Sequence, residues 1–252
     1  MVNVNNVSKT YQEVKVVDGV SVHIKKGKIT SFIGSNGAGK STLLSMVSRL
    51  IPKDEGSVLL DGEEITSYDN RELAKRLSVL KQSNNIKVRI TVRELVSFGR
   101  FPYTQGKLKD EDKKLIDESI HYMNLEAFED RFLDELSGGQ KQRAYIAMVI
   151  AQDTDYILLD EPLNNLDMKH SKQIMKALRR MVDELGKTVV IVIHDINFAS
   201  CYSDHIVALK DGKCVYEGTT EEMISNDVLR EVYDMEFNVC KIDGNRICVF
   251  FT

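Results

Sequence analysis

The residues whose types and spacing are best suited to chemistry lie at positions 33–42. They read Ile-Gly-Ser-Asn-Gly-Ala-Gly-Lys-Ser-Thr and contain the pattern G-x-x-x-x-G-K-[ST]. The glycines let backbone N–H groups approach a phosphate closely, because they carry no Cβ atom. Lys40 would place a positive charge on the β- and γ-phosphates, and the Ser41 hydroxyl would ligate Mg²⁺. The predicted phosphate-binding residues are Gly34, Ser35, Asn36, Gly37, Ala38, Gly39, Lys40, Ser41 and Thr42.

Two adjacent carboxylates form a second candidate group. Asp160 and Glu161 follow the apolar run 156–159, and Pro162 comes directly after them. A continuous apolar run is typical of a parallel strand buried on both faces, and ligands bind at the carboxyl ends of such strands. We therefore expect Asp160 to contact Mg²⁺, directly or through water, and Glu161 to orient and deprotonate an attacking water.

His194 and Gln82 are predicted to end two further strands, at residues 188–193 and 78–81. An isolated histidine is usually structural, but at the carboxyl edge of a sheet its ring can donate a hydrogen bond to a γ-phosphate oxygen. The Gln82 amide can contact a metal ion or a water molecule. Both side chains are therefore candidates for the same site as the carboxylates.

A second glycine-rich helix start lies at residues 136–140, which read Leu-Ser-Gly-Gly-Gln. The Ser137 hydroxyl and the N–H groups of Gly138 and Gly139 would form a second anion site at a helix N-terminus. The alternative is an ordinary capping box between Ser137 and Gln140. That alternative leaves the two glycines unexplained, because glycine weakens a helix start.

The elements around the first glycine-rich loop are typical of a phosphate site. Residues 29–33 form a short β-rich run, and residues 41–50 have the pattern of a helix ended by Pro52. A strand, a glycine loop and a helix in this order direct the helix N-terminus at an anion. The pattern therefore favours a ligand site over a plain glycine-rich turn.

The order of predicted elements gives a three-part organisation. Residues 2–31 have a β pattern that includes separate runs at 14–17 and 20–24, and residues 83–155 are mainly helical. From residue 156 onward strands and helices alternate, with one helix at 168–185 ended by Gly186. We predict an α/β fold in which residues 1–82 and 156–252 form the core and residues 83–155 are a helical insertion.

The composition is that of an ordinary globular chain. Its 252 residues are 42% hydrophobic and 29% charged, and the net charge of −4 gives no reason to expect a nucleic-acid partner. The cysteines are far apart in sequence and form no C-x-x-C pair, which disfavours zinc; they are Cys201, Cys214, Cys240 and Cys248. We expect neither a signal peptide nor a membrane-spanning helix.

Taken together, these segments resemble the motifs of ABC-transporter nucleotide-binding subunits, in order and in spacing. The resemblance covers nearly the whole chain and includes residues 34–41, 136–140, 156–161 and 164–167, together with Gln82 and His194. It implies a RecA-like P-loop NTPase core with an N-terminal antiparallel β subdomain and an inserted α-helical subdomain. It also implies an ATPase that uses ATP and Mg²⁺.

The resemblance assigns roles residue by residue. It implies that Tyr11 stacks on adenine, although a plain β-strand aromatic is the simpler interpretation from the residues alone. It implies that Glu161 is the catalytic base, that His194 is the switch histidine and that Asp167 lies in the D-loop. It makes Gln82 both a catalytic residue and, with Ser41 and Asp160, a metal contact. Two copies are expected to pair head to tail, so that residues 136–140 of one copy close on ATP held by the other.

The chain departs from the family pattern at the D-loop, where Leu163, Asn164 and Asn165 replace the common Thr-Ser-Ala. Asn164 can still form a hydrogen bond across a dimer. Residues 98–103, Phe-Gly-Arg-Phe-Pro-Tyr, resemble the Gly-Arg-x-Pro-His segment of importers for iron-siderophores, haem and cobalamin, with Tyr103 in place of the histidine.

These features lead us to expect the ATPase subunit of a bacterial ABC importer for ferric siderophore. Haem and cobalamin are alternative cargoes, and a soluble non-transport ABC ATPase is a different class, disfavoured by the single P-loop and the lack of a heptad run. A scaffold without catalysis is disfavoured by the intact acidic and basic site residues. The expected partners are permease subunits that dock near residues 82–103, a substrate-binding protein as an indirect partner, and a second copy. The expected location is the cytoplasmic face of the cell membrane.

Overall fold

The computed structural model describes residues 1–82 and 88–251, and the chain forms two compact units. The first unit joins two segments that are far apart in sequence, Met1–Tyr68 and Thr188–Thr252. The second unit is the continuous segment Asp69–Lys187. The start of the predicted helical insertion, residues 83–87, lies outside the described residues. Within the described part of the chain, no helix is both long and apolar enough to cross a membrane.

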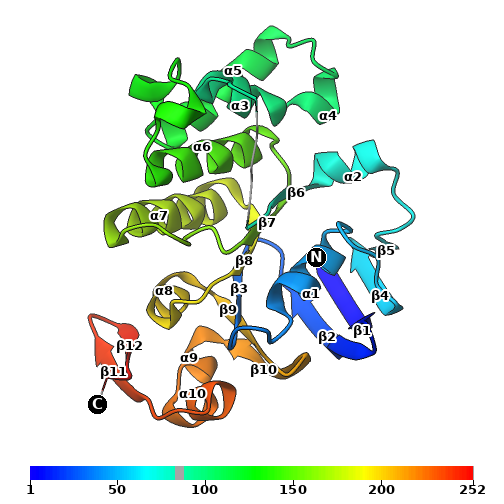
Figure 1. The fold of residues 1–252 in the computed structure, drawn as a ribbon, viewed down its shortest axis with the longest axis vertical. Helices are drawn as coiled ribbons and strands as arrows, with labels where there is room; N and C mark the ends of the chain where they lie inside the picture. The colour runs from blue at the N-terminus through cyan, green and yellow to red at the C-terminus, as the bar shows by residue number, and fades with distance from the viewer. Residues whose placement is uncertain (83–87, 252) are drawn as a thin grey trace. The chain divides into compact units, whose positions relative to one another are not determined.

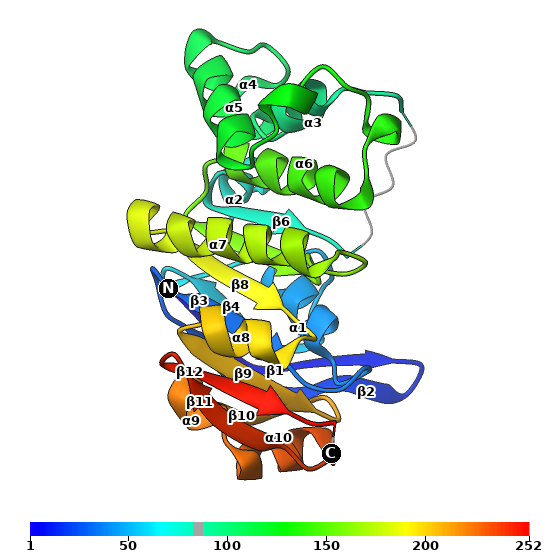
Figure 2. The same cartoon turned by 90° about the vertical axis from the view of Figure 1, so that its left-hand side faces the viewer.

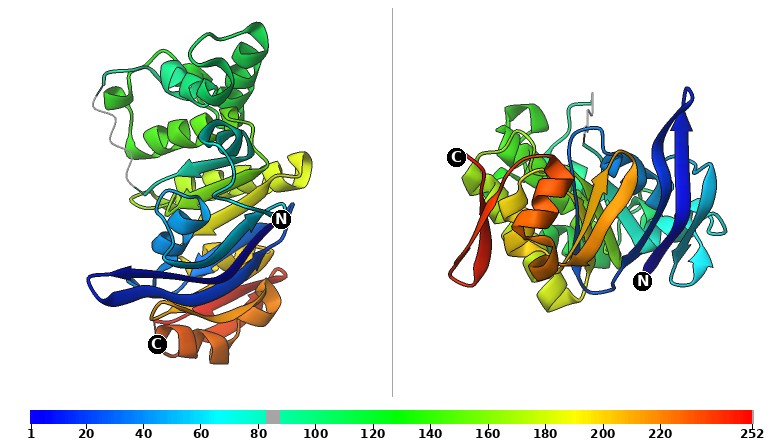
Figure 3. Two further views of the ribbon diagram at one scale, coloured as in Figure 1. Left: turned by 90° about the vertical axis from the view of Figure 1, so that its right-hand side faces the viewer. Right: turned by 90° about the horizontal axis from the view of Figure 1, so that it is seen from below.

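The first unit contains an antiparallel sheet whose strands follow the order β2-β1-β4-β5 (Figure 3). β1 (Val2–Tyr11) pairs along its length with β2 (Val14–Ile24), and β4 (Glu55–Leu60) pairs with β1 and with the short β5 (Glu63–Glu64). The two runs predicted within residues 14–24 lie in this one strand. Gly19 has a φ of +62°, and the register between β1 and β2 shifts nearby, so β2 passes through an irregularity without ending.

The same unit contains the strand that leads into the glycine loop. β3 (Ile29–Ile33) is fully buried and lies between two parallel neighbours, β8 (Thr188–Val192) and β9 (His205–Lys210). β10 (Lys213–Thr219) runs antiparallel to β9. Burial on both faces explains why β3 and β8 lack the alternation of polar and apolar residues seen in half-exposed strands.

Helices and a terminal hairpin complete the first unit (Figure 1). The P-loop helix α1 is Lys40–Val47, shorter than the predicted 41–50, and α8 is Ile196–Tyr202. Two short helices follow β10, namely α9 (Thr220–Met223) and α10 (Asn226–Tyr233). The chain then forms a hairpin, with β11 (Asn238–Ile242) paired to β12 (Asn245–Val249).

The second unit combines a strand pair with helices. β6 (Leu77–Leu80) and β7 (Tyr156–Asp160) are parallel, and the adjoining helices are α2 (Asn70–Arg76) and α7 (Met168–Leu185). α6 (Gly138–Ala151) packs against α3 (Val92–Phe98) and α5 (Asp110–Tyr122), and the one-turn α4 (Phe101–Thr104) contacts α2. Short 3₁₀ turns lie at Glu126–Phe128 and Leu133–Glu135.

A buried ion pair holds the helical part of the second unit. Arg100 Nε lies 2.9 Å from Asp112 Oδ1, and a guanidinium nitrogen of Arg100 donates to the Ala151 carbonyl at 2.9 Å. Both charged side chains are 7% exposed, so the pair is removed from solvent and strongly dependent on both partners. The pair joins α5 to the segment that links α3 to α4.

Candidate nucleotide-binding site

Two glycines of the loop after β3 stand where no other residue fits. Gly34 has a φ of +136°, and a Cβ atom at this position would lie 2.0 Å from the Leu209 carbonyl oxygen of β9. Gly39 has a φ of +94°, and its Cβ would lie 2.5 Å from the Val16 carbonyl oxygen. Both conflicts involve backbone atoms, which cannot swing aside as a side chain can. The loop therefore takes a conformation that depends on glycine at both positions.

The N-terminus of α1 is left for a ligand. Its N-cap is Gly39, and within the described chain no side chain caps the helix. The first N–H groups of a helix have no partner inside the helix, and its dipole favours negative charge at that end. An anion at this position would satisfy both, as expected for a nucleotide phosphate.

Lys40 folds back over the loop that it follows. Its Nζ donates to the carbonyl oxygens of Gly34 and Ser35, at 2.8 Å each, and the residue is only 5% exposed. The contacts hold the ammonium group against the cradle rather than in solvent. A fixed positive charge beside an uncapped helix N-terminus fits a phosphate group, so the residues present suit a nucleotide.

Tyr11 and His194, the other candidates in the first unit, are both exposed. Tyr11 lies at the end of β1 with 46% of its surface exposed, and Lys9 Nζ is 5.5 Å from its ring centre. His194 follows β8, and the next residue, Asp195, caps α8 by accepting from the N–H groups of Asn197 and Phe198. Both side chains therefore lie at the surface of the first unit.

In the second unit, the structure brings Gln82, Glu161 and Asn164 together. Glu161 Oε2 accepts a hydrogen bond from Gln82 Nε2 at 2.5 Å and a further one from Asn164 Nδ2. Glu161 also has a φ of +49°, which is a strained backbone conformation for a glutamate. Residues with strained backbones are found most often at functional sites. The Asn164 contact was missed at the sequence level, where this residue was given only a role across a dimer. Its position three residues after Glu161, in a turn, was the available signal.

The second glycine-rich helix start has the predicted capping box. Ser137 Oγ accepts from the Gln140 N–H at 3.3 Å, and the Ser137 N–H donates to Gln140 Oε1 at 2.9 Å. Gly139 is buried, and a Cβ built on it would lie 2.7 Å from His170 Cγ, so packing against α7 accounts for this glycine. A Cβ built on Gly138 would have no described atom within 4 Å, apart from its two chain neighbours and the backbone of its own helix. Packing therefore leaves the exposed Gly138 unexplained.

Asp167 caps α7 and orients the histidine that meets Gly139. Asp167 Oδ1 accepts from the His170 N–H at 2.8 Å and lies 2.8 Å from His170 Nδ1. The hydrogen bond from the His170 backbone N–H, with that from its ring, lowers the pKa of Asp167 below the ordinary value for aspartate. The D-loop and the 136–140 segment are thus linked through His170.

Metal ligands are sparse among the described residues, where no group of three or more His, Cys, Asp and Glu side chains could hold a metal. The three Mg²⁺ contacts predicted from the sequence, Ser41, Gln82 and Asp160, include one carboxylate. Such a set suits Mg²⁺, which commonly takes one or two carboxylates and completes its octahedron with waters and nucleotide phosphates.

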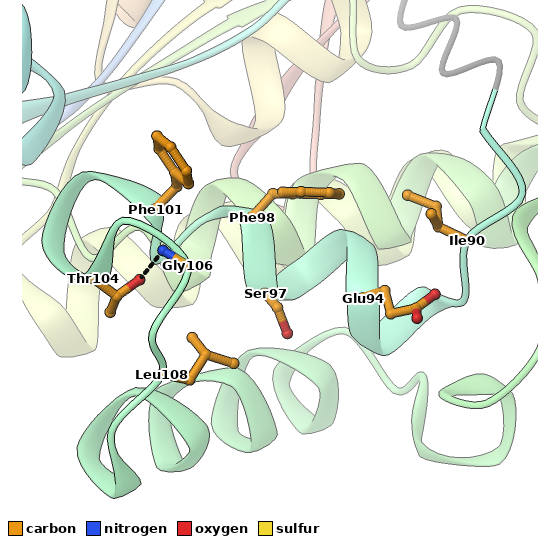
Figure 4. A pocket seen from close by; sticks show the side chains of 8 residues that line it. All are labelled: Ile90, Glu94, Ser97, Phe98, Phe101, Thr104, Gly106 and Leu108. Atoms are coloured by element: carbon orange, nitrogen blue, oxygen red, sulfur yellow. Dashed lines mark hydrogen bonds between the residues drawn. The ribbon is translucent and has the colours of Figure 1, made fainter.

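An apolar groove of about 420 Å³ lies among the helices of the second unit (Figure 4). Two aromatic side chains at its rim, Phe98 and Phe101, are 54% and 57% exposed. Contiguous exposed apolar patches are typical of surfaces that bind another molecule, so this groove is a candidate docking surface. The lining residues are Ile90, Glu94, Ser97, Phe98, Phe101, Thr104, Gly106 and Leu108.

Comparison with known proteins decides the family. Residues 17–164 match the family model described as ABC transporter. The chain belongs to the ABC transporter family. Like the other ATP-binding cassettes of this family it binds nucleotide and is an ATPase, with the mixed α/β, parallel-sheet fold of P-loop NTPases.

Individual relatives of this cassette match along its length. It is 64% identical over 252 residues to the petrobactin import ATP-binding protein YclP of Bacillus subtilis strain 168, with all of both chains covered. It is 45% identical to the petrobactin import ATP-binding protein FatE of Bacillus anthracis, over 99% of this chain and 100% of the relative. The dimeric structure of MJ0796, a bacterial ABC transporter cassette, superimposes with a TM-score of 0.79 at 34% identity, covering 87% of this chain and 99% of the other.

Proposed function

We propose that this cassette supplies the ATP hydrolysis for import of a ferric siderophore of the petrobactin class. The main support for this proposal is the 64% identity, over the full length of both chains, to a petrobactin import ATP-binding protein. The glycines, Lys40, Asp160, Glu161 and His194 needed for hydrolysis are all present in this chain. This combination supports an active importer subunit over a scaffold.

ATP is held in this proposal by the first unit's loop. Residues 34–42 bind the β- and γ-phosphates through Lys40 and through backbone N–H groups other than that of Gly34, and Tyr11 stacks on the adenine. Ser41, Asp160 and Gln82 would hold Mg²⁺, which neutralises charge on the transferred phosphoryl group. His194 donates a hydrogen bond to a γ-phosphate oxygen.

Glu161 is the proposed general base. Its carboxylate orients the attacking water and accepts the proton, while Gln82 and Asn164 hold Oε2 by their amide N–H groups. The strained backbone at Glu161 fits a residue held in place for chemistry. Movement of Gln82 would change the position of this carboxylate, which offers a route from a docked partner to the reaction.

A second copy completes the site in this proposal. Ser137, Gly138, Gly139 and Gln140 of one copy close on ATP bound by the other, with Asp167 at the same contact. The exposed Gly138, for which packing gives no reason, supports this arrangement. The dimeric MJ0796 cassette provides a precedent at 34% identity.

The apolar groove is the proposed docking site for a helix of the membrane permease. We infer that residues 83–155 act as the helical subdomain that carries both this groove and residues 136–140. A groove lined by Phe98, Phe101 and Leu108 suits an apolar helix face, and Glu94 offers one charged contact. The cassette would then act at the cytoplasmic face of the membrane, with a substrate-binding protein as an indirect partner.

The test is uptake of radiolabelled cargo by iron-starved cells whose own copy is replaced by Glu161→Gln. The panel of cargoes contains ferric petrobactin, a ferric hydroxamate, haem and labelled cobalamin. Asp183→Asn is the matched control, because it also replaces a carboxylate by an amide, but on the surface of α7. We expect Glu161→Gln to abolish uptake of ferric petrobactin and Asp183→Asn to leave it unchanged. Unchanged uptake of every cargo, with ATP hydrolysis lost in the purified variant, would reject the importer assignment.

A further inference from the structure

The first glycine of the P-loop is held by a residue from the other end of the chain. The Gly34 N–H donates to the Tyr233 hydroxyl at 3.2 Å, across 199 positions in sequence. Burial raises the pKa of the Tyr233 phenol to about 12, so the group remains a neutral hydroxyl at physiological pH. Tyr233 is the last residue of α10, and no motif discussed above includes it.

α10 is anchored at the same end of β9 that crowds Gly34. Lys210 Nζ donates to the Glu231 carbonyl at 2.6 Å and lies 2.7 Å from Asp234 Oδ1. Its neighbour Leu209 supplies the carbonyl that excludes a Cβ at Gly34. The end of β9 thus fixes both the glycine and the helix whose tyrosine contacts it.

A line of aromatic rings connects Tyr233 to the terminal hairpin. The ring centres of Tyr233 and Phe237 are 5.7 Å apart, and those of Phe237 and Phe250 are also 5.7 Å apart. Phe237 is 8% exposed, so its ring is packed rather than free to rotate into solvent. These rings limit the positions that the Tyr233 hydroxyl can take.

The hairpin also holds the helix that follows His194. Asn197 of α8 accepts from the Cys248 N–H at 2.7 Å and donates to the Cys248 carbonyl at 3.2 Å. Ser200 Oγ donates to the Arg246 carbonyl at 2.5 Å. Figure 2 shows β12 alongside α8, within the first unit. One hairpin therefore contacts both α8 and the aromatic line to the P-loop.

We propose that residues 226–250 are a positioning element for the nucleotide site, and that Tyr233 is the positioning residue that keeps Gly34 in its phosphate-binding conformation. The proposal rests on ATP binding by residues 34–42, as argued under the proposed function. A ligand binds more weakly when only a fraction of the molecules has the competent loop. Loss of the Tyr233 hydroxyl removes a hydrogen bond from the loop but leaves the ring packing in place.

The test compares Tyr233→Phe with Tyr216→Phe in the purified full chain. Tyr216 donates to Glu231 Oε2 at 2.5 Å, so its variant also loses one hydroxyl contact to α10, away from the P-loop. We expect Tyr233→Phe to weaken ATP binding about two- to tenfold, the range expected for one neutral hydrogen bond. KM for ATP should rise while kcat at saturating ATP stays near the wild-type value, and Tyr216→Phe should bind ATP like the wild type.

Two further readouts separate loop positioning from general stability. Amide hydrogen exchange of the peptide that contains Gly34 should accelerate in Tyr233→Phe but not in Tyr216→Phe. Phe237→Leu keeps the hydroxyl but loosens its packing, and should weaken ATP binding by a smaller factor. ATP affinity and exchange equal to those of Tyr216→Phe, even with a lower melting temperature, would overturn the proposal. A wild-type chain that bound no ATP would instead reject the proposed function.

Discussion

The two glycine-rich helix starts of this chain satisfy their N–H groups in opposite ways. At the P-loop, α1 begins at Gly39 without a side-chain cap among the described residues, and Lys40 lies against the loop. At the second start, α6 begins after Ser137 with a complete capping box. The first start has donors left for a phosphate, whereas the second already uses two of its donors internally.

The glycines differ in the same sense. Gly34 and Gly39 have positive φ values and would collide with backbone carbonyls if they carried a Cβ. Gly139 is limited by a histidine side chain, and Gly138 by nothing described within 4 Å apart from its own helix backbone and chain neighbours. The glycines of the P-loop are therefore fixed by backbone contacts within one copy of the chain, whereas residues 136–140 present an exposed helix start, for which we propose the nucleotide of a second copy as the ligand.

Gly34→Ala should have the largest effect. It would combine a left-handed strain of about 1–2 kcal/mol with a 2.0 Å contact to the Leu209 carbonyl, and we expect more than about 3 kcal/mol of lost stability and no ATP binding. Gly37→Ala is the matched control, because φ is +81° but no described atom crowds its Cβ, own neighbours aside. Urea unfolding and ATP titration measure both. If the two variants lost equal stability and equal ATP affinity, backbone strain and not the clash with Leu209 would explain the effect.

Gly139→Ala should come next. The new methyl would lie 2.7 Å from His170 Cγ, and overpacking of this kind costs about 1–3 kcal/mol. Because the obstacle is a side chain, the second change His170→Ala should restore most of the lost stability. A double-mutant cycle by urea unfolding measures the coupling between the two positions. Additive effects would mean that the imidazole does not limit Gly139.

Ser137→Ala should cost about 1 kcal/mol of stability by removing the N-cap of α6. Gly138→Ala, one position further on, should be neutral or stabilise by up to about 1 kcal/mol, since alanine favours a helix. Thermal unfolding with ATPase assays distinguishes the two roles of this segment. If residues 136–140 close on a second copy's ATP, both variants should lose activity despite their opposite effects on stability.

The smallest expected effect is a pH dependence at Asp167. Its pKa is lowered in the fold by hydrogen bonds from the His170 backbone and ring, so this carboxylate stabilises the fold above the unfolded value of 3.8. The contribution is lost as pH falls through the folded pKa. Asp167→Asn should therefore show a slightly shallower loss of stability in acid than the wild type. Identical acid unfolding curves for the variant and the wild type would show that the Asp167 carboxylate does not stabilise the fold.

Local pattern was enough to predict the elements that carry the chemistry. The loop 34–42, the strand before the two carboxylates and the helix at 168–185 each follow from spacing and propensity within a short window. The capping box between Ser137 and Gln140, weighed as the alternative to an anion site, is local in the same way. The gap between the runs 14–17 and 20–24 coincides with Gly19, where a positive φ makes β2 irregular without ending it.

Contacts between distant segments could not be predicted. The Gly34–Tyr233 hydrogen bond and the approach of His170 to Gly139 depend on how separate elements pack, which no periodicity records. The Glu161–Gln82 contact joins the ends of two strands that are neighbours only in the folded sheet. Sequence reasoning therefore predicts candidate reacting side chains but not the residues that contact them in the fold.

The most direct test of the contrast between the two helix starts is the mass of Glu161→Gln in solution with and without ATP. The variant should bind ATP without hydrolysing it, so light scattering is expected to show one chain without ATP and two chains with it. Adding Ser137→Arg, which places a bulky side chain at the second helix start, should leave ATP binding intact and abolish the dimer. A single-chain mass for Glu161→Gln with ATP fully bound would contradict the account.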